Sequence, residues 1–229
     1  LERGSMGWKY ILFDLDGTLT DSNEGILNFV VYALEAAGME IPDRDTLLKF
    51  IGPPLVDGFQ EITGMTREEA VTATAKYRER YGVIGLFENK PYEGIEQVLS
   101  ELKKQGKLLA LATSKPETYA VRILQHFHLM KYFDETAGSE LDGTRNDKAE
   151  VIREALRRLN ISKEEYRDVI MVGDRRHDII GAGKCGIESL GVYYGFAEPG
   201  ELEQAGADYI AHSVSDVLEI VGDEGMKER

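Results

Sequence analysis

Two aspartates follow the first apolar run of the chain. Asp14 and Asp16 lie two residues apart in the segment FDLDGTLTDS, directly after the apolar run at 10–13. By itself this pattern suits the turn at the end of a strand, where Asp and Gly are common. Two carboxylates at this spacing also suit nucleophilic attack, acid–base work or the binding of a divalent cation. The segment alone leaves these interpretations open.

Other polar residues follow later apolar runs in the same way. Thr113 and Ser114 close the segment LLALATS, and Lys148 comes after a polar loop. Asp174 and Asp178 lie in GDRRHD, directly after the run VIMV. Singly, each has an ordinary explanation as a helix cap, a solvated lysine or a surface turn. Their common position after apolar runs indicates a shared site.

Strand and helix signals alternate along most of the chain. Apolar runs predict strands at 9–13, 107–113, 135–138, 168–173, 189–193 and 209–211. Periodicity, capping signals and stop glycines predict helices at 95–105, 116–127, 147–159, 177–185, 198–204 and 214–221, with Asn146 as the cap of the third. Strands separated by helices predict an α/β fold, a Rossmann-like parallel sheet with helices on both faces.

The stretch between 22 and 89 shows helical signals and no strand. Ser22–Ala37 carries one apolar stripe, and Thr66–Glu69 is a capping box for a helix that runs to Tyr81. We expect an all-α cap domain inserted into the sheet core, with core at 7–20, cap at 21–88 and core again at 89–222. The first residues, LERGS at 1–5, are interpreted as the remnant of an expression tag.

An open parallel sheet binds its ligands beyond the carboxyl ends of its strands. The side chains that follow the strands should therefore converge there. Oxygens from Asp14, Asp16 and Asp174 suit a hard cation, and Mg²⁺ favours a few carboxylates plus water. Lys148 adds a positive charge, and the Thr113 hydroxyl with nearby backbone N–H groups suits a phosphoryl oxygen. Such a set can hold and neutralise a phosphoryl group.

Bulk composition narrows the range of partners. The formal charge of −14 argues against binding to a nucleic acid polymer or an anionic membrane. The single cysteine, Cys185, excludes a disulfide within the chain and a cysteine-rich zinc cluster. No apolar run approaches the ~18 residues of a membrane span. We expect a cytoplasmic protein that binds a small phosphorylated metabolite, as a monomer or alternatively a dimer.

Taken in order and with their spacing, these motifs resemble those of haloacid dehalogenase (HAD) superfamily phosphatases. The similarity is greatest to the branch with an α-helical cap after the first motif, which includes phosphoglycolate phosphatases. It extends over nearly the whole chain, from Lys9 to Val221. The motifs are specific for the superfamily and much less so for a substrate.

The resemblance implies a role for each motif residue. Asp14 would attack phosphorus and form an aspartyl-phosphate, while Asp16 would protonate the leaving group and then accept a proton from water. Mg²⁺ would be bound by the carboxylates of Asp14 and Asp174 and by the backbone carbonyl of Asp16. Lys148 would bridge Asp14 and the phosphoryl group. Asp178 would hold a metal-bound water or Lys148.

Several residues would bind the substrate. Thr113 would donate to a phosphoryl oxygen, with the backbone N–H of Ser114 assisting. Gly17 gives its turn conformational freedom, and Thr18 would tie that turn down. The cations Arg44, Lys49 and Lys115 are candidates for a second anionic group on the substrate. No role is assigned to Arg175, Arg176 or His177.

The presence of Asp16 favours phosphoryl transfer, because the dehalogenases that attack carbon lack this second aspartate. A phosphonatase would need a lysine in the cap, for which Lys49 and Lys76 are the candidates. The expected activity is Mg²⁺-dependent hydrolysis of a small phosphomonoester such as phosphoglycolate, a nucleotide or a sugar phosphate. A phosphomutase of the same superfamily and a noncatalytic binding module remain the alternatives.

Overall fold

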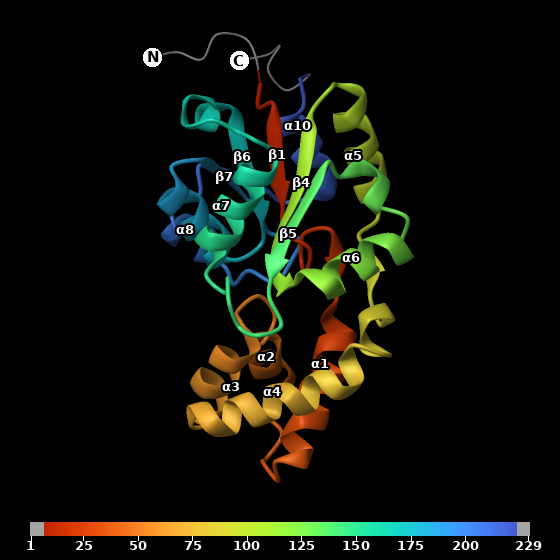
Figure 1. The fold of residues 1–229 in the computed structure, drawn as a ribbon, viewed down its shortest axis with the longest axis vertical. Helices are drawn as coiled ribbons and strands as arrows, with labels where there is room; N and C mark the ends of the chain where they lie inside the picture. The colour runs from red at the N-terminus through yellow and green to blue at the C-terminus, as the bar shows by residue number, and fades with distance from the viewer. Residues whose placement is uncertain (1–6, 224–229) are drawn as a thin grey trace.

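A six-stranded parallel sheet forms the upper part of the molecule, in the computed structural model that describes residues 7–223 (Figure 1). The strand order is β5-β4-β1-β6-β7-β8. The strands are β1 (Tyr10–Phe13), β4 (Leu108–Pro116), β5 (Glu135–Ser139), β6 (Val169–Gly173), β7 (Glu188–Val192) and β8 (Tyr209–Ala211). The expected tag remnant at 1–5 lies outside the described residues.

Helices cover both faces of the sheet because the side chains of β1 alternate between two apolar layers. Ile11 and Phe13 join the layer that includes α5 (Ile95–Lys104), α6 (Glu117–His126) and α10 (Val214–Val221). Tyr10 and Leu12 join the layer that includes α7 (Lys148–Arg158) and α8 (Arg176–Cys185). The two groups of helices lie on opposite sides of the sheet in Figure 1. The predicted α/β sheet core is confirmed.

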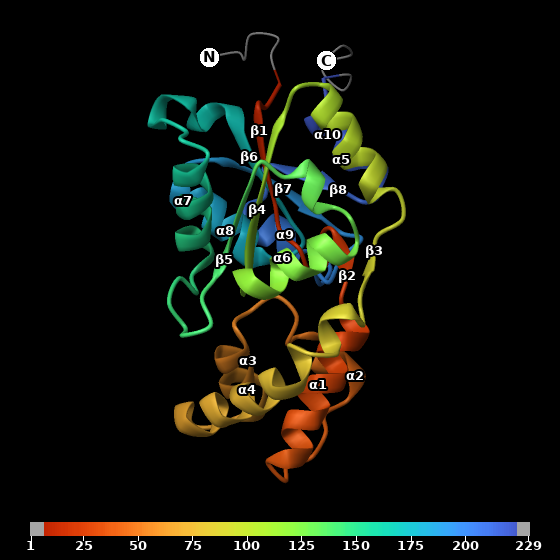
Figure 2. The same ribbon diagram turned by 45° about the vertical axis from the view of Figure 1, so that its right-hand side comes forward.

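An all-helical cap lies below the sheet (Figures 1 and 2). It consists of α1 (Asn23–Ala36), α2 (Arg44–Leu48), α3 (Leu55–Thr63), α4 (Arg67–Tyr81) and the 3-10 turn η1 (Gly85–Phe87). The α4 helix begins with the expected capping box of Thr66 and Glu69. Aromatic edges hold the cap together, since Phe29 packs against Tyr77 and Tyr81 of α4. The predicted inserted helical cap is thus confirmed as part of the fold.

Two very short antiparallel strands connect cap and core. They are β2 (Thr20–Asp21), where the chain leaves the core, and β3 (Lys90–Pro91), where it returns. Strands of two residues are too short to produce a periodic pattern, and the sequence did not predict them. The pairing brings the two crossing segments side by side (Figure 2). The predicted domain boundaries at 21 and 88 stay a prediction.

Local chemistry shifted three element ends from their predicted positions. Asp147 rather than Asn146 caps α7, because its carboxylate accepts from the backbone N–H of Ala149 while Asn146 donates to the carbonyl of Gly143. The β4 strand continues to Pro116, so α6 begins one residue later than expected. The helix predicted at 198–204 is confined to α9 (Glu201–Gln204), which starts after the left-handed Gly200.

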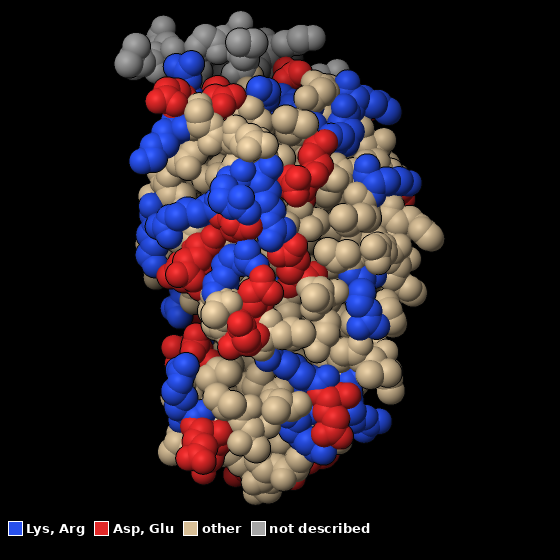
Figure 3. All heavy atoms as spheres, viewed as in Figure 1, with Lys and Arg blue, Asp and Glu red and all other residues tan. Residues whose placement is uncertain are grey.

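Two remaining segments form 3-10 turns, η2 (Met130–Tyr132) and η3 (Lys163–Asp168), the latter beginning with a capping box of Ser162 and Glu165. Within residues 7–223 there is no helix both long and apolar enough to cross a bilayer. On the face in Figure 3, acidic and basic side chains are interspersed. That face therefore carries no extended field of a single sign.

Candidate active site

The register of the sheet brings the ends of three strands together. Phe13 of β1 pairs with Leu111 of β4 on one side and with Val172 of β6 on the other. The next residues along the three strands therefore meet at the carboxyl edge of the sheet. Asp14 lies at the centre of this edge, and its backbone N–H donates to the carbonyl of Val172 over 2.9 Å. Thr113 and Asp174 follow on its two sides.

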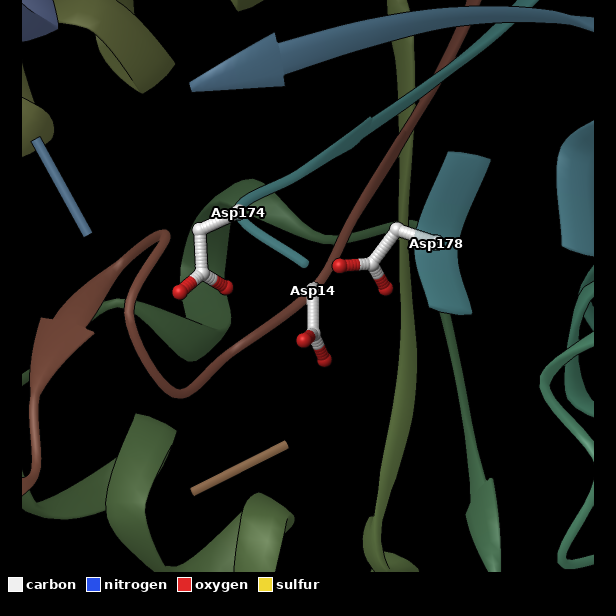
Figure 4. Close-up of side chains that lie close together, drawn as sticks. All are labelled: Asp14, Asp174 and Asp178. Carbon is white, nitrogen blue, oxygen red and sulfur yellow. The ribbon is translucent and has the colours of Figure 1, made fainter. Parts of the chain in front are cut away.

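Three buried carboxylates gather at this edge. Ligand oxygens of Asp14, Asp174 and Asp178 lie within 4.8 Å of one another. Figure 4 shows Asp14 and Asp174 on loops that follow strands and Asp178 on α8. Burial, followed by the charges of Asp178 and Asp14, raises the pKa of Asp174 well above its ordinary value. Burial also raises the pKa of Asp178 to about 6, although Lys148 opposes the shift.

Lys148 supplies the positive charge of this cluster. Its Nζ lies 3.0 Å from Asp14 Oδ1 and 2.7 Å from Asp178 Oδ1, and it donates to the carbonyl of Ala112 over 2.9 Å. Burial lowers its pKa, but the two carboxylates outweigh that effect and raise it to about 12. The ammonium therefore stays charged at neutral pH. Gly181 lets the side chain pass, because a Cβ there would lie 2.9 Å from Lys148 Cγ.

The donor set fits a hard divalent cation. Three carboxylates face one ammonium, which leaves a formal excess of two negative charges in a buried space. Oδ1 of Asp14 is buried and accepts no hydrogen bond of good geometry. Carboxylate oxygens are the ligands that Mg²⁺ prefers, and a divalent ion would balance the excess. The third carboxylate is that of Asp178 rather than Asp16, and a ligand role for the Asp16 carbonyl stays a prediction.

The Asp16 side chain turns away from the carboxylate cluster to Lys115. Its Oδ2 lies 3.0 Å from Lys115 Nζ, which also donates to the hydroxyl of Tyr81 over 2.6 Å. Burial lowers the pKa of Lys115, but Asp16 and Tyr81 outweigh it and raise the pKa above its ordinary value. Oδ1 of Asp16 is buried without a hydrogen bond. Lys115 is thus tied to Asp16 instead of being free to bind a distant anion.

The turn after Asp16 positions Asp174. Gly17 has a φ of +80°, and a Cβ at this residue would lie 2.1 Å from Asp174 Oδ2. Only glycine permits both this conformation and this approach. Thr18 Oγ1 donates to Asp174 Oδ1 over 3.3 Å, and the backbone N–H of Phe196 donates to Oδ2 over 2.8 Å. Gly17 and Thr18 therefore contact a carboxylate of the cluster.

Thr113 and Ser114 lie where β4 reaches the same edge. Thr113 is buried, and its Oγ1 accepts from the backbone N–H of Lys115 over 3.2 Å. The carbonyl of Ser114 accepts from Ser139 Oγ over 2.8 Å. Both residues line the same cavity as Asp14 and Asp16. The predicted substrate-binding residues at this position are thus brought beside the two aspartates.

A cavity of about 340 Å³ separates the sheet edge from the cap. The core contributes Asp14, Asp16, Thr113, Ser114 and Lys115, and the cap contributes residues from α3, α4 and the loop before α3. Its volume is in the range of small-molecule sites. The cap therefore covers the aspartates with a wall of its own side chains.

Other candidates from the sequence lie elsewhere. Lys49 forms an ion pair with Glu198 at 3.8 Å, and Lys76 pairs with Glu79 at 2.9 Å. Neither lysine lines the cavity, nor do Arg44 and His177. Burial, assisted by Arg176, lowers the pKa of His177. Because the only lysine among the described residues of the cavity wall is Lys115, the phosphonatase alternative lacks a cap lysine in place.

Two arginines beside the site were not assigned a function from the sequence. Arg175 donates from Nη1 to the carbonyl of Ile51 over 2.6 Å and pairs through Nε with Glu201 at 2.9 Å, so it joins the loop after β6 to the cap. Arg78 of α4 donates to the carbonyl of Leu141 over 2.7 Å and lines the cavity. The spacing of Arg67, Val71, Thr74 and Arg78 on one helix face was the available signal for Arg78.

A family model described as haloacid dehalogenase-like hydrolase matches residues 11–192. The chain belongs to this family. It is 45% identical over 198 residues to a 5′-nucleotidase of Pseudomonas aeruginosa, covering 86% of this chain and 88% of that protein. It is 36% identical over 208 residues to a tyrosine-protein kinase of Mycobacterium tuberculosis, covering 90% of this chain and 69% of the kinase.

A solved structure shows the same fold. The crystal structure of a predicted phosphatase from Clostridium acetobutylicum superimposes with a TM-score of 0.89 at 45% identity, covering 98% of this chain and 100% of the other. The predicted enzyme class, a hydrolase of the haloacid dehalogenase-like family, is confirmed.

Proposed function

We propose that this protein is an Mg²⁺-dependent phosphatase that hydrolyses a small phosphomonoester through an aspartyl-phosphate on Asp14. One observation carries the proposal: buried Asp14 belongs to the carboxylate cluster, contacts the charged Lys148 and lines a cavity that Asp16 also lines. The similarity to the 5′-nucleotidase supports hydrolysis of a phosphomonoester. The substrate is left within the classes of phosphoglycolate-like compounds, nucleotides and sugar phosphates.

In the first step an oxygen of Asp14 attacks phosphorus. The new Asp14–phosphorus bond forms as the bond from phosphorus to the leaving oxygen breaks, and Asp16 gives its proton to that oxygen. Asp16 Oδ1, which accepts no hydrogen bond, is the oxygen available for this transfer. Lys148 keeps Asp14 in position through its 3.0 Å contact, and its charge opposes the negative charge of the phosphoryl group.

In the second step water replaces Asp14 on phosphorus. Asp16, now a carboxylate, takes a proton from the water as its oxygen bonds to phosphorus, and the bond to Asp14 breaks. Phosphate leaves, and both aspartates return to their starting forms. Thr113 and Ser114, at the end of β4, would donate hydrogen bonds to the phosphoryl oxygens. When bound by Asp14 and Asp174, with Asp178 adjacent, Mg²⁺ would neutralise phosphoryl charge.

The replacement Asp14→Asn tests the nucleophile. We expect loss of phosphate release from p-nitrophenyl phosphate in the presence of Mg²⁺, because an amide oxygen is a poor nucleophile at phosphorus. Circular dichroism and the unfolding temperature should show a folded variant. The control Asp168→Asn changes a partly exposed carboxylate just before β6 and should keep wild-type turnover. Wild-type turnover by Asp14→Asn would show that the nucleophile is misassigned.

The same assay separates the alternatives. A phosphomutase would release very little phosphate unless a bisphosphate activator is present, and a noncatalytic binding module would release none. The similarity to a tyrosine-protein kinase adds a further alternative, in which the phosphoryl group is transferred to an acceptor other than water. Sustained phosphate release by the wild type, lost in EDTA and restored by Mg²⁺, is the result expected for the proposed phosphatase.

A further inference from the structure

One face of helix α4 forms part of the cavity wall. Arg67, Val71, Thr74 and Arg78 all line the cavity, at the spacing of successive turns of a helix. The same helix ends at Tyr81, whose hydroxyl accepts from Lys115 and is thereby linked to Asp16. The α4 face therefore extends from the aspartates along the length of the cavity, where the leaving group of a substrate would lie.

Arg78 is held on this face without a carboxylate partner. Its Nη1 donates to the carbonyl of Leu141 over 2.7 Å, which fixes the guanidinium between the cap and the loop after β5. Among the described residues it forms no ion pair, and its Nε is buried without a hydrogen bond. A guanidinium has five N–H donors, so most of its hydrogen-bonding capacity is unused by the protein.

The other partly buried arginines within residues 7–223, which are Arg145, Arg158 and Arg175, all form ion pairs, unlike Arg78. The sequence has 41 acidic against 27 basic residues, so carboxylate partners are plentiful. On the same helix, Lys76 pairs with Glu79 and Arg80 stacks over the ring of Tyr32. In the core, Arg158 and Arg175 both pair with glutamates. A partly buried arginine without an anion costs free energy, and a bound anion would offset that cost.

We propose that Arg78 binds a second anionic group of the substrate, at the end of the leaving group away from the scissile phosphate. The proposal rests on the proposed phosphatase function. A carboxylate or a second phosphate has the chemistry to pair with a guanidinium. Among the residues that the structure describes, the cavity wall has two other cationic side chains: Lys115 pairs with Asp16, and Arg67 lies at an exposed position at the start of α4. Arg78 is left as the anion receptor.

Three phosphate esters with the same three-carbon chain test this assignment. Propyl phosphate has a neutral tail, 3-phosphooxypropanoate a carboxylate, and propane-1,3-diol bisphosphate a second phosphate. We expect the wild type to cleave at least one anionic probe with a kcat/KM about tenfold or more above that for propyl phosphate. Comparison of the two anionic probes identifies the preferred anion.

The variant Arg78→Gln removes the charge and keeps a polar side chain of similar reach. The preference for the anionic probe should fall by about tenfold to a hundredfold, the size expected for loss of a charge-assisted hydrogen bond, with most of the change in KM. Arg80→Gln is the matched control, because it removes the same charge from an exposed position on the same helix. It should keep the wild-type preference.

Two results would overturn the assignment of Arg78 while leaving the phosphatase intact. One is that the wild type cleaves propyl phosphate as efficiently as it cleaves both anionic probes. A site for a neutral leaving group, such as a nucleoside, would give this result. The other is that Arg78→Gln and Arg80→Gln change the preference for the anionic probe equally. The loss of one positive charge anywhere on the helix would then explain the change. Failure to cleave any probe or p-nitrophenyl phosphate with Mg²⁺ would instead overturn the proposed function and this subsite together.

Discussion

Replacing a buried carboxylate of the site should stabilise the metal-free protein. Asp174 is fully buried, lies within 4.8 Å of ligand oxygens of Asp14 and Asp178, and forms no ion pair closer than 4.0 Å among the described residues. Burial and these like charges raise its pKa well above the ordinary value of 3.8. A carboxyl with a raised folded pKa costs stability at a pH above its unfolded pKa. Asp174→Asn removes this cost.

The expected gain can be bounded from the structure. At an effective dielectric of about 20, one like-charged pair 4.8 Å apart repels by about 3.5 kcal/mol. Uptake of a proton limits the total cost at pH 7 to about 4 kcal/mol. The amide can keep both existing contacts, accepting from the Phe196 N–H and donating to the Thr18 hydroxyl. After allowing for weaker, uncharged hydrogen bonds, we expect a net gain of about 2 kcal/mol.

Thermal unfolding in EDTA and in Mg²⁺ measures this effect. For a chain of this size, a gain of about 2 kcal/mol raises Tm by about 4–8 °C in EDTA. Mg²⁺ at about a hundred times its Kd should stabilise the wild type by about 2.7 kcal/mol and the variant much less, because a ligand is missing. Lowering the pH should shrink the difference between the two metal-free proteins, since wild-type Asp174 then becomes protonated.

The control Asp168→Asn makes the same replacement at the opposite end of β6, where the side chain is 40% exposed. It should change neither Tm nor the response to Mg²⁺. A lower Tm of Asp174→Asn in EDTA, or an undiminished response to Mg²⁺, would refute the view that repulsion among these carboxylates is relieved by a cation.

Two further replacements test the loops around the site. Gly17→Ala should destabilise the protein by about 2 kcal/mol or more and reduce turnover at least tenfold, because the new Cβ would collide with Asp174. Gly38 has a similar positive φ but open space around it. Gly38→Ala should therefore show only backbone strain of about 1 kcal/mol and normal turnover. Equal effects of the two on turnover would contradict this reasoning. Arg175→Gln should raise KM severalfold, because the contact between the metal-side loop and the cap is lost, whereas Arg176→Gln, at an exposed position, should not. Steady-state kinetics and thermal unfolding of purified variants measure both pairs, and an unchanged KM in Arg175→Gln would exclude a role for the contact.

Much of the fold was predictable because its signals are local. The strands of the sheet appear as short apolar runs, and the helices carry caps and stop signals that depend on neighbouring residues. Where the prediction failed, the cause was equally local: β2 and β3 have two residues each, and Asp147 displaced Asn146 as a cap. The missed β2 and β3 form a separate two-stranded sheet where the chain enters and leaves the cap, and the other error moved only the start of a helix.

The sequence by itself determined which residues would reach the functional edge. Asp14 and Asp174 follow directly after buried strands, and Thr113 lies near the end of another. Because parallel strands end at one edge, their convergence needed no knowledge of side-chain contacts. The identity of the chemistry followed from these residue types and their order.

Only the tertiary structure decided which charged atoms meet. Asp178 rather than Asp16 completes the carboxylate cluster, Lys115 pairs with Asp16, and Arg78 lines the cavity without a carboxylate partner. These outcomes depend on how α8 packs against the sheet and how the cap sits over it, which involve residues far apart in the chain. Side-chain periodicity reports which face of an element is buried, but ion pairing is set by separations of a few ångströms between different elements.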